Sequence, residues 1–297
     1  MNTKTIKKSV GDRILSLIIA LFMIVFVIVT LYPVINTVAI SFNDGIDAIR
    51  GGIYLWPRKF TMKNYDTVLA MQNLAVGAKI TVARTVIGTL SSLVVNSLLA
   101  YVVSRKRFLF KTELSLFWVI TMYVNGGMIP TFMLYRNLGL TGTFWVYVIP
   151  GMISAWNMLV IRTYMLGIPD SLEESAQLDG AGYMTIFVKI ISPLCKPVYA
   201  TVALFVAVYR WNSWFDAMLY NRMKTEYTTL QYELMKLLSS VMQQGASADL
   251  AKYNSATITP VSIRSAATVI TMLPIICLYP FLQRYFVTGL TIGGVKE

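Results

Sequence analysis

Long apolar stretches separated by short polar segments dominate this chain of 297 residues. A helix that crosses a bilayer needs about 20 consecutive, mostly apolar residues, whereas a buried strand rarely exceeds about eight. Six stretches are long enough for a span, at about 14–40, 78–104, 114–134, 144–165, 194–219 and 265–287. The pattern therefore predicts an all-α, polytopic membrane protein with six transmembrane helices.

Composition supports a bilayer as the solvent. Hydrophobic residues make up 56% of the chain, charged residues only 13%, and the mean hydropathy is +0.61. The net charge of +12 would suggest nucleic acid in a soluble protein, but here the basic residues flank apolar runs, where they orient helices and meet anionic lipid. We expect residues 14–297 to form one transmembrane domain, because the length leaves no room for a large second one.

The basic residues also predict which segments face the cytoplasm, since Lys and Arg accumulate in cytoplasmic loops. They crowd the segment before the first span and the link between the second and third spans, namely Lys4, Lys7, Lys8, Arg13, Arg105, Lys106, Arg107 and Lys111. Both termini, with residues 1–13, are then cytoplasmic, as is the segment at about 166–193. The loops at about 43–76 and 221–260 lie outside, and the second is patterned for a short amphipathic helix near 230–241.

The third span contains the sequence NGGMIP. Gly126, Gly127 and Pro130 weaken helical hydrogen bonding in the middle of the membrane, where irregular backbone is tolerated only when it is buried in protein or lines a cavity. The alternative is close packing of helices through the two glycines. The sequence leaves a hinge or path element and simple close packing equally open.

The polar segment between the fourth and fifth spans is patterned for two short helices. Ser171 followed by Glu174 predicts a capping box at the start of the first helix, and Gly180 predicts its end in a left-handed conformation. Asp179 in the last turn opposes the helix dipole, so we expect a compensating partner. The second helix has an apolar face that can pack against the bundle or a docking protein, formed by Ile186, Phe187, Ile190 and Ile191.

This segment, EESAQLDGAGYMTIFVKIISPLCKP, resembles the EAA loop of binding-protein-dependent ATP-binding-cassette importer permeases. The residues at the E-A-A and D-G-A positions of that motif are Glu174, Ser175, Ala176, Asp179, Gly180 and Ala181. Serine replaces the usual first alanine, and the family's F-x-x-I-x-x-P-L-x-x-P spacing continues to Pro197. YPVINTVAISF and GLTIGGVKE resemble the carbohydrate-uptake permeases. The branch that imports oligosaccharides released from complex plant or algal polysaccharides resembles this chain along NGGMIPTFMLYRNLGLTGTFWVYVIPGMISAWNMLVIRTYM.

The resemblance implies a transmembrane subunit of an ATP-driven carbohydrate importer in the bacterial cell membrane. Its EAA loop carries a cytoplasmic coupling helix between the fourth and fifth spans, which docks in a groove of an ATPase subunit and is presented by the turn at Gly180. Glu174 either contacts the ATPase or completes its own capping box, and Asp179 is the better candidate for a partner elsewhere. The expected partners are a second, paralogous permease, two ATPase subunits that bind ATP and Mg²⁺, and an extracellular solute-binding protein that contacts the outer loops.

The fifth span, with the sequence YRWNSWFDAMLY, is unusually polar and aromatic for a membrane helix. On a continuous helix Tyr209, Asn212 and Asp216 form one polar stripe, which we expect to face a substrate path. Tryptophan rings can stack on sugars, but an aromatic belt at the outer interface is the alternative for them. The residues predicted for the path are Tyr209, Trp211, Asn212, Trp214 and Asp216, with Tyr123, Asn125 and Asn157 as weaker candidates. Arg210 either snorkels or pairs with an unidentified acidic group.

Other classes of function lack their usual residues. The absence of histidine removes an imidazole base, a His-ligated metal site and a His-based triad. Cys195 and Cys277 lie in apolar surroundings without a metal or redox motif, so we expect no metal. No G-x-x-x-x-G-K-[ST] sequence occurs, so ATP must be hydrolysed by a partner and this chain is expected to be non-catalytic and without a cofactor of its own.

Two alternatives stay open at this point. An importer of another solute class would carry the same coupling segment. An ion-coupled secondary transporter normally shows intramembrane Asp, Glu or His relays, whereas Asp216 stands nearly alone. The sequence specifies neither the sugar, its length and its charge, nor whether this subunit contacts it.

Overall fold

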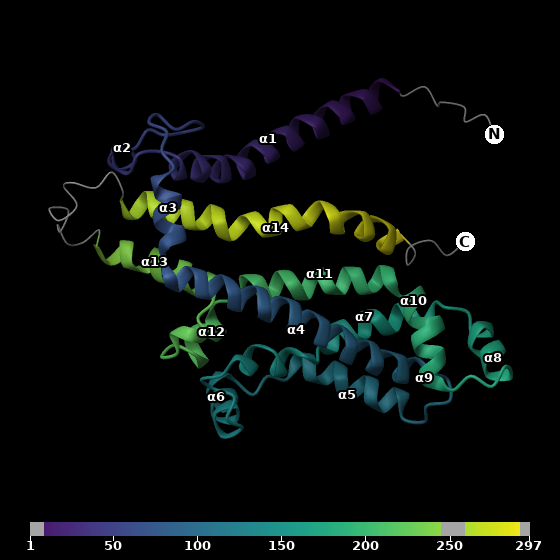
Figure 1. The fold of residues 1–297 in the computed structure, drawn as a ribbon. Coiled ribbons are helices and arrows are strands. Elements are labelled where there is room, and N and C mark those ends of the chain that lie inside the picture. Colours follow the sequence, from purple (N-terminus) through teal and green to yellow (C-terminus); the bar gives the residue numbers. More distant parts are fainter. Residues whose placement is uncertain (1–8, 245–258, 292–297) are drawn as a thin grey trace. The chain divides into compact units, whose positions relative to one another are not determined.

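The computed structural model describes residues 9–244 and 259–291, and helices account for most of them (Figure 1). These residues form two compact units, one with residues up to Ala70 and Leu237–Ile270, the other with Met71–Lys236 and the residues from Thr271 onward. The basic residues Lys4, Lys7 and Lys8, part of the predicted loop at 221–260 and most of GLTIGGVKE lie outside the described residues.

Helices that are long and apolar enough to cross a membrane account for the predicted spans. Three do so alone: α1 (Val10–Ser41), α4 (Gln72–Ser104) and α14 (Pro260–Thr291), the last through Pro260–Pro280. Three pairs of helices are long and apolar enough when each bent pair is taken as one span. They are α5 (Lys111–Tyr123) with α6 (Met128–Asn137), Phe144–Gly151 with α7 (Ala155–Leu166), and Tyr183–Leu194 with α11 (Lys196–Asn212). Up to six spans, and no strand among the described residues beyond an isolated bridge between Asn43 and Phe60, confirm the predicted all-α polytopic fold.

The third span is broken at the NGGMIP sequence. α5 and α6 meet at an angle of 114°, and Gly127, directly before α6, has a φ of +86°. A Cβ atom added at Gly126 would meet nothing within 4 Å. The glycines therefore lie at a sharp bend, and within the described residues no other helix packs closely against them. A hinge or path role stays a prediction.

Two further spans depart from the regular helices that the sequence predicts. The fourth begins with two 3-10 turns, η1 (Phe144–Tyr147) and η2 (Ile149–Gly151), because Pro150 cannot donate a helical hydrogen bond. The fifth ends at Asn212, Ser213 is extended, and a separate short helix α12 (Phe215–Tyr220) follows. Asp216 thus lies on a different helix from Tyr209, and the predicted continuous polar stripe is wrong.

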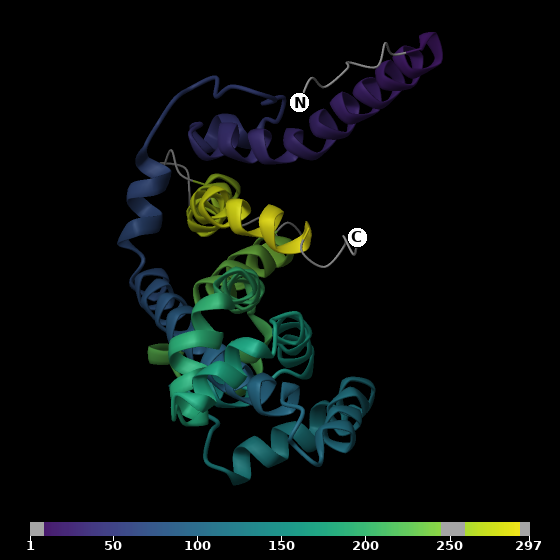
Figure 2. The same cartoon turned by 90° about the vertical axis from the view of Figure 1, so that its right-hand side faces the viewer.

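α4 is the central helix of the second unit. Its buried face carries small and polar residues spaced by four, namely Arg84, Gly88, Ser92, Asn96 and Ala100. Its exposed face is apolar, with Val82, Val86, Leu90 and Val94. Because small residues allow helices to approach closely, α7 and α11 pack along the first face, as Figure 2 shows in a view nearly along these helices.

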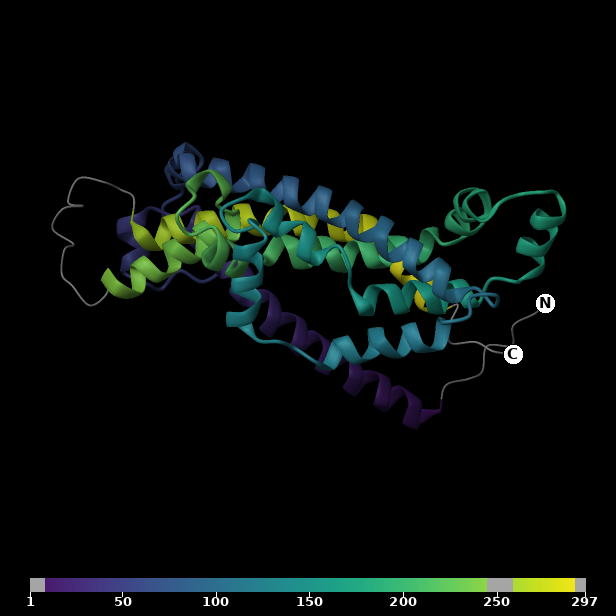
Figure 3. The ribbon, with the colours of Figure 1, turned by 90° about the horizontal axis from the view of Figure 1, so that it is seen from below.

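The segment after Gly180 joins the same core. α9 (Tyr183–Ile186), the π-helical turn η3 (Phe187–Ile191) and α10 (Ser192–Leu194) lead into α11. Ile186, Phe187 and Ile191 are buried against Tyr101 of α4 and Met158 of α7, so the predicted apolar face packs on the bundle of its own chain. In contrast, α8 (Ser171–Leu178) projects beyond the ends of α4 and α11 (Figures 1 and 3).

The first unit contains most of the predicted outer loop at 43–76. A polar network holds this loop together: the Asn43 amide and the Arg58 guanidinium donate to Asp47, at 3.0 and 3.1 Å, and Asn64 donates to the carbonyls of Ser41 and Asn43. The short helices α2 (Gly45–Ile49) and α3 (Lys63–Ala70) lie within it. The remaining elements are η4 (Thr225–Tyr227) and α13 (Leu230–Gln244), which confirms the helix predicted near 230–241.

Candidate functional site

The end of α8 turns sharply at Gly180, as the sequence predicts. Gly180 has a φ of +82°, its N–H donates to the carbonyl of Gln177 at 3.0 Å, and the Ala181 N–H donates to the carbonyl of Ala176 at 2.9 Å. These two bonds form a Schellman motif, which requires a left-handed residue that glycine adopts without a steric cost. The turn separates the projecting helix α8 from α9, whose last residue Ile186 is buried in the core.

The start of α8 differs from the prediction. Asp170 is the N-cap, Ser171 is the first helical residue, and no side chain caps the helix, so the capping box of Ser171 and Glu174 is wrong. A capping box needs its serine at the N-cap, one position before the first helical residue. Here the helix begins one residue earlier than predicted, so Asp170 occupies the N-cap and Ser171 lies inside the helix. The Glu174 side chain is consequently free of that role and exposed, as is Asp179, which has no ion pair among the described residues.

The inner face of α8 is tied to the end of α4 by an ion pair. Arg105, directly after α4, donates to the Glu173 carboxylate, and both side chains are largely buried. The Arg105 guanidinium also lies over the Tyr101 ring, 4.8 Å from its centroid. A second, exposed ion pair joins Lys106 to Asp170. The hydrogen bond from Lys106 lowers the pKa of Asp170, and the same bond raises the pKa of Lys106.

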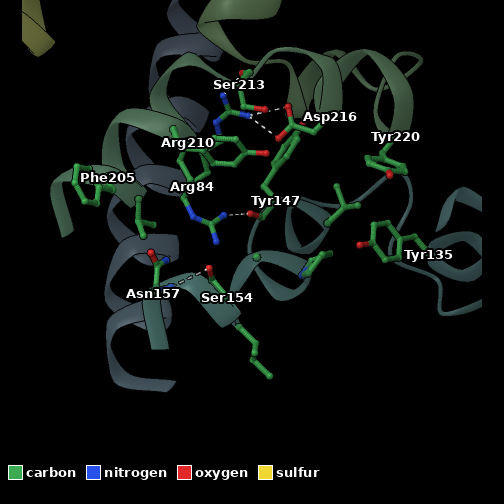
Figure 4. Close-up of a pocket in the computed structure, with 16 residues that line it drawn as sticks. Arg84, Tyr135, Tyr147, Ser154, Asn157, Phe205, Arg210, Ser213, Asp216 and Tyr220 are labelled. Atoms are coloured by element: carbon green, nitrogen blue, oxygen red, sulfur yellow. Dashed lines mark hydrogen bonds and ion pairs between the residues drawn. The ribbon is translucent and has the colours of Figure 1, made fainter. Parts of the chain in front are cut away.

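A cavity of about 500 Å³ lies in the second unit, where η1 and η2 meet α4, α11 and α12 (Figure 4). Its polar lining combines tyrosines, an amide, two serines and three charged groups: Tyr135, Tyr147, Tyr209, Tyr220, Asn157, Ser154, Ser213, Arg84, Arg210 and Asp216. Flat aromatic faces with hydrogen-bonding side chains are suited to a polar ligand with apolar ring faces.

Arg84 of α4 is bound to the turn between α11 and α12. Its guanidinium donates to both carboxylate oxygens of Asp216, at 3.1 and 3.3 Å, and to the carbonyl of Ser213. The Arg84 side chain is 1% exposed and lies 5.3 Å from the centroid of the Tyr147 ring. Such a pair neutralises a charge that would be costly in the membrane interior.

Arg210 of α11 has a different environment. Figure 4 shows its side chain directed at Tyr147, whose carbonyl it binds, and a longer bond of 3.5 Å reaches the carbonyl of Val148. A Cβ atom at Gly88 or Gly151 would come within 2.5 or 2.6 Å of the Arg210 side chain. Two glycines on two different elements therefore make room for this one side chain. No carboxylate within the described residues pairs with it.

Comparison with known proteins identifies the family. The chain is 32% identical over 286 residues, 96% of its length and 99% of the relative, to the polygalacturonan/rhamnogalacturonan transport system permease protein YtcP of Bacillus subtilis. It is 31% identical over 268 residues, 90% of both chains, to protein LplC of the same organism. The chain belongs to the transport system permeases of ATP-binding-cassette importers. No family model matches it.

A solved structure agrees with this family. The permease aligns with a chain of a bacterial ATP-binding-cassette transporter involved in the import of the acidic polysaccharide alginate, with a TM-score of 0.87 and 30% identity, over 95% of this chain and all of the other. The resemblance that the EAA-type segment indicates is therefore confirmed. The six spans of the permease follow the fold of that importer subunit.

Three of the residues predicted for a substrate path line the cavity: Tyr209, Asp216 and Asn157. The other five do not, because the chain breaks after Asn212 and bends after Tyr123. The Trp211 indole N–H donates to the carbonyl of Thr271, and the Asn212 side-chain amide donates to the carbonyl of Val208. The Trp214 ring packs edge-on against the Phe215 ring. The Asn125 side-chain oxygen accepts from the Gly127 N–H, and Tyr123 is exposed.

Sequence reasoning missed Arg84, Tyr147, Arg105 and Glu173. For Arg84 a signal was present, since an arginine inside the apolar run 78–104 is rare and marks a functional or paired position. Arg210 was expected to snorkel or to pair with an acid, and it does neither among the described residues: it binds backbone carbonyls of the bent fourth span.

Proposed function

We propose that this permease imports oligosaccharides derived from complex polysaccharides, as one transmembrane subunit of an ATP-driven importer in the bacterial cytoplasmic membrane. The observation that carries the proposal is similarity along almost the whole chain to a relative named for polygalacturonan/rhamnogalacturonan transport. The 30% identity to the chain of an alginate importer supports the same substrate class. Both termini then face the cytoplasm, as the basic residues indicate.

The assembly that we propose contains a second, paralogous permease, two ATPase subunits and an extracellular solute-binding protein. The exposed surface of α8 supports docking of an ATPase there. Leu178 is 90% exposed, and Leu172 of α8 and Tyr183 and Met184 of α9 are exposed as well. Apolar side chains displayed on a polar segment are typical of a helix that lies in a partner's groove. This chain itself catalyses nothing, and ATP with Mg²⁺ binds to the partner.

The cavity supports a substrate contact in this subunit. Tyr209 is 74% exposed and offers a flat face for a sugar ring, while Asn157 and Asp216 provide hydrogen bonds. In this proposal ATPase closure is transmitted through α8 to α4 and α11, which carry the lining residues Arg84 and Tyr209. The coupling residues are those predicted: Glu174, Ser175, Ala176, Asp179, Gly180 and Ala181.

Uptake measurements test this function. A strain that lacks the gene should lose uptake of labelled oligosaccharides, and purification of the permease from membranes should co-isolate an ATPase. In proteoliposomes with the whole complex, uptake should require ATP and be unaffected by an ionophore. Uptake that needs an ion gradient and no nucleotide would favour the secondary-transporter alternative instead.

A further inference from the structure

The charge balance of the cavity is uneven. Three of the lining residues are charged: Arg84, Arg210 and Asp216. Asp216 is engaged at 3.1 and 3.3 Å by Arg84, so that pair is neutral as a unit. The guanidinium of Arg210, which is only 6% exposed, carries one positive charge, and no carboxylate among the described residues lies within 4.0 Å of it.

Backbone carbonyls do not remove this charge. Tyr147 and Val148 accept hydrogen bonds from Arg210, but a carbonyl carries only a partial charge, whereas a guanidinium stays protonated at any physiological pH. A buried cation without a counter-ion is costly in a membrane protein, and intramembrane charges of this kind mark solute pathways. The structure nonetheless makes room for it with Gly88 and Gly151.

The neighbouring groups define the kind of anion. Tyr135 and Tyr220 lie with ring centroids 5.3 Å apart at one end of the lining, and Asn157 and Ser154 lie at another (Figure 4). Aromatic faces, an amide and a hydroxyl suit the ring and hydroxyl groups of a sugar. A volume of about 500 Å³ is also within the range of sites that hold small organic ligands.

We propose that Arg210 is the counter-charge for the carboxylate of an acidic sugar, so that the cavity binds a uronate unit of the transported oligosaccharide. Arg84 is held away from this role by Asp216. The inference rests on the proposed function, and it adds both the charge of the substrate and the residue that selects for it. The guanidinium would bind the carboxylate through its positive charge and its N–H donors, as is usual for carboxylates bound by arginine.

Direct binding to the purified importer complex tests the site without the solute-binding protein, which has a selectivity of its own. The probes are short oligogalacturonides as free acids and the same oligomers with methyl-esterified carboxyls. The wild-type complex should bind the free acids at least about tenfold more tightly, and this preference should shrink as salt is raised.

Substitution of Arg210 assigns the preference to one residue. Arg210→Gln keeps a hydrogen-bond donor but removes the charge, so it should weaken binding of the free acids at least about tenfold and leave binding of the esters unchanged. Arg210→Lys keeps the charge and should recover most of the loss. Arg222→Gln is the matched control, because Arg222 is exposed and outside the cavity, and it should change neither affinity.

The outcomes separate the inference from the proposed function. Equal weakening of both probes by Arg210→Gln would mean that Arg210 only holds the bent fourth span, and equal binding of both probes by the wild type would also overturn the site. If Arg210→Gln does not assemble, the wild-type complex still tests the site. Tighter binding of the free acids than of the esters, with a preference that shrinks as salt is raised, would support it, and its absence would overturn it. A complex that transports no carbohydrate, acidic or neutral, would refute the proposed function itself.

Discussion

Arg84 lies in the middle of an apolar helix, and the cost of burying its charge is offset by Asp216, 132 residues further along the chain. The pair also fixes the break between α11 and α12, because the same guanidinium binds the carbonyl of Ser213 where the helical bonding stops. A freed backbone carbonyl at membrane depth needs such a donor. One side chain thus satisfies a charge and a backbone defect together.

Removal of one partner from this pair should cost more than removal of both. Asp216→Asn leaves two buried guanidinium groups without a carboxylate, so we expect it to destabilise the permease by about 3 kcal/mol. The double variant Arg84→Gln with Asp216→Asn removes one of those charges and should regain part of the loss. Thermal unfolding of the detergent-purified complex measures both, and a double variant no more stable than Asp216→Asn would contradict the argument.

Gly180 is a second residue with a role that its conformation dictates. A β-branched side chain at a φ of +82° is strained, by roughly 1–2 kcal/mol or more, so Gly180→Val should disturb the turn that presents α8. We expect normal insertion in the membrane but a lower ratio of transported sugar to hydrolysed ATP. Gly182→Val is the matched control, because Gly182 has an ordinary φ of −74° and open space around its Cβ position. Equal coupling in the two variants would refute this role.

At the scale of elements, α4 connects the two candidate sites. It carries Arg84 at the cavity, and the chain passes directly from its end to Arg105, which holds Glu173 on the inner face of α8. An ion pair of two largely buried side chains is screened far less than an exposed one. The Arg105–Glu173 pair is therefore suited to transmit a displacement of α8 to α4.

A charge exchange tests this connection. Arg105→Glu and Glu173→Arg each place two like charges together, so either alone should reduce transport per ATP hydrolysed at least about tenfold. The double exchange restores an ion pair and should recover much of the coupling. Lys106→Glu is the control, because its ion pair with Asp170 is exposed and worth little. A double exchange that stays as uncoupled as the single variants would argue against the connection.

The exposed ion pair between Lys106 and Asp170 predicts that the local stability of α8 depends on pH. The pKa of Asp170 is lowered below 3.8 by the hydrogen bond from Lys106, so the folded state favours its ionised form. The contribution of this pair is therefore complete above the ordinary pKa and is lost as the pH falls through the lower, folded value. The protection that this pair gives α8 against hydrogen exchange should be constant between about pH 5 and pH 8 and fall at more acidic pH, and Lys106→Gln should remove that fall. An unchanged acid response in Lys106→Gln would contradict this.

For the whole molecule, the spans were predictable because lipid imposes a length on every apolar run. The turn at Gly180 was predictable too, since a helix end is a local property. The pairs of Arg84 with Asp216 and of Arg105 with Glu173 join residues 132 and 68 apart, and no periodicity specifies such neighbours. The break after Asn212 was missed because YRWNSWFDAMLY contains neither glycine nor proline. What stabilises that break is Arg84, which only the tertiary structure brings to it.

Docking of an ATPase is a property of the assembled complex and not of a local segment of this chain. Leu178 follows the E-A-A positions and is 90% exposed, so a polar replacement should not affect the stability of the permease itself. If an ATPase covers α8, Leu178→Ser should reduce the amount of ATPase that co-purifies, because an apolar contact is lost at the centre of the interface. Met223→Ser is the matched control, since Met223 is equally exposed but lies in the predicted outer loop. Retention of the ATPase by both variants would place the docking surface away from Leu178, whereas its loss from both would point to a general defect of the membrane domain.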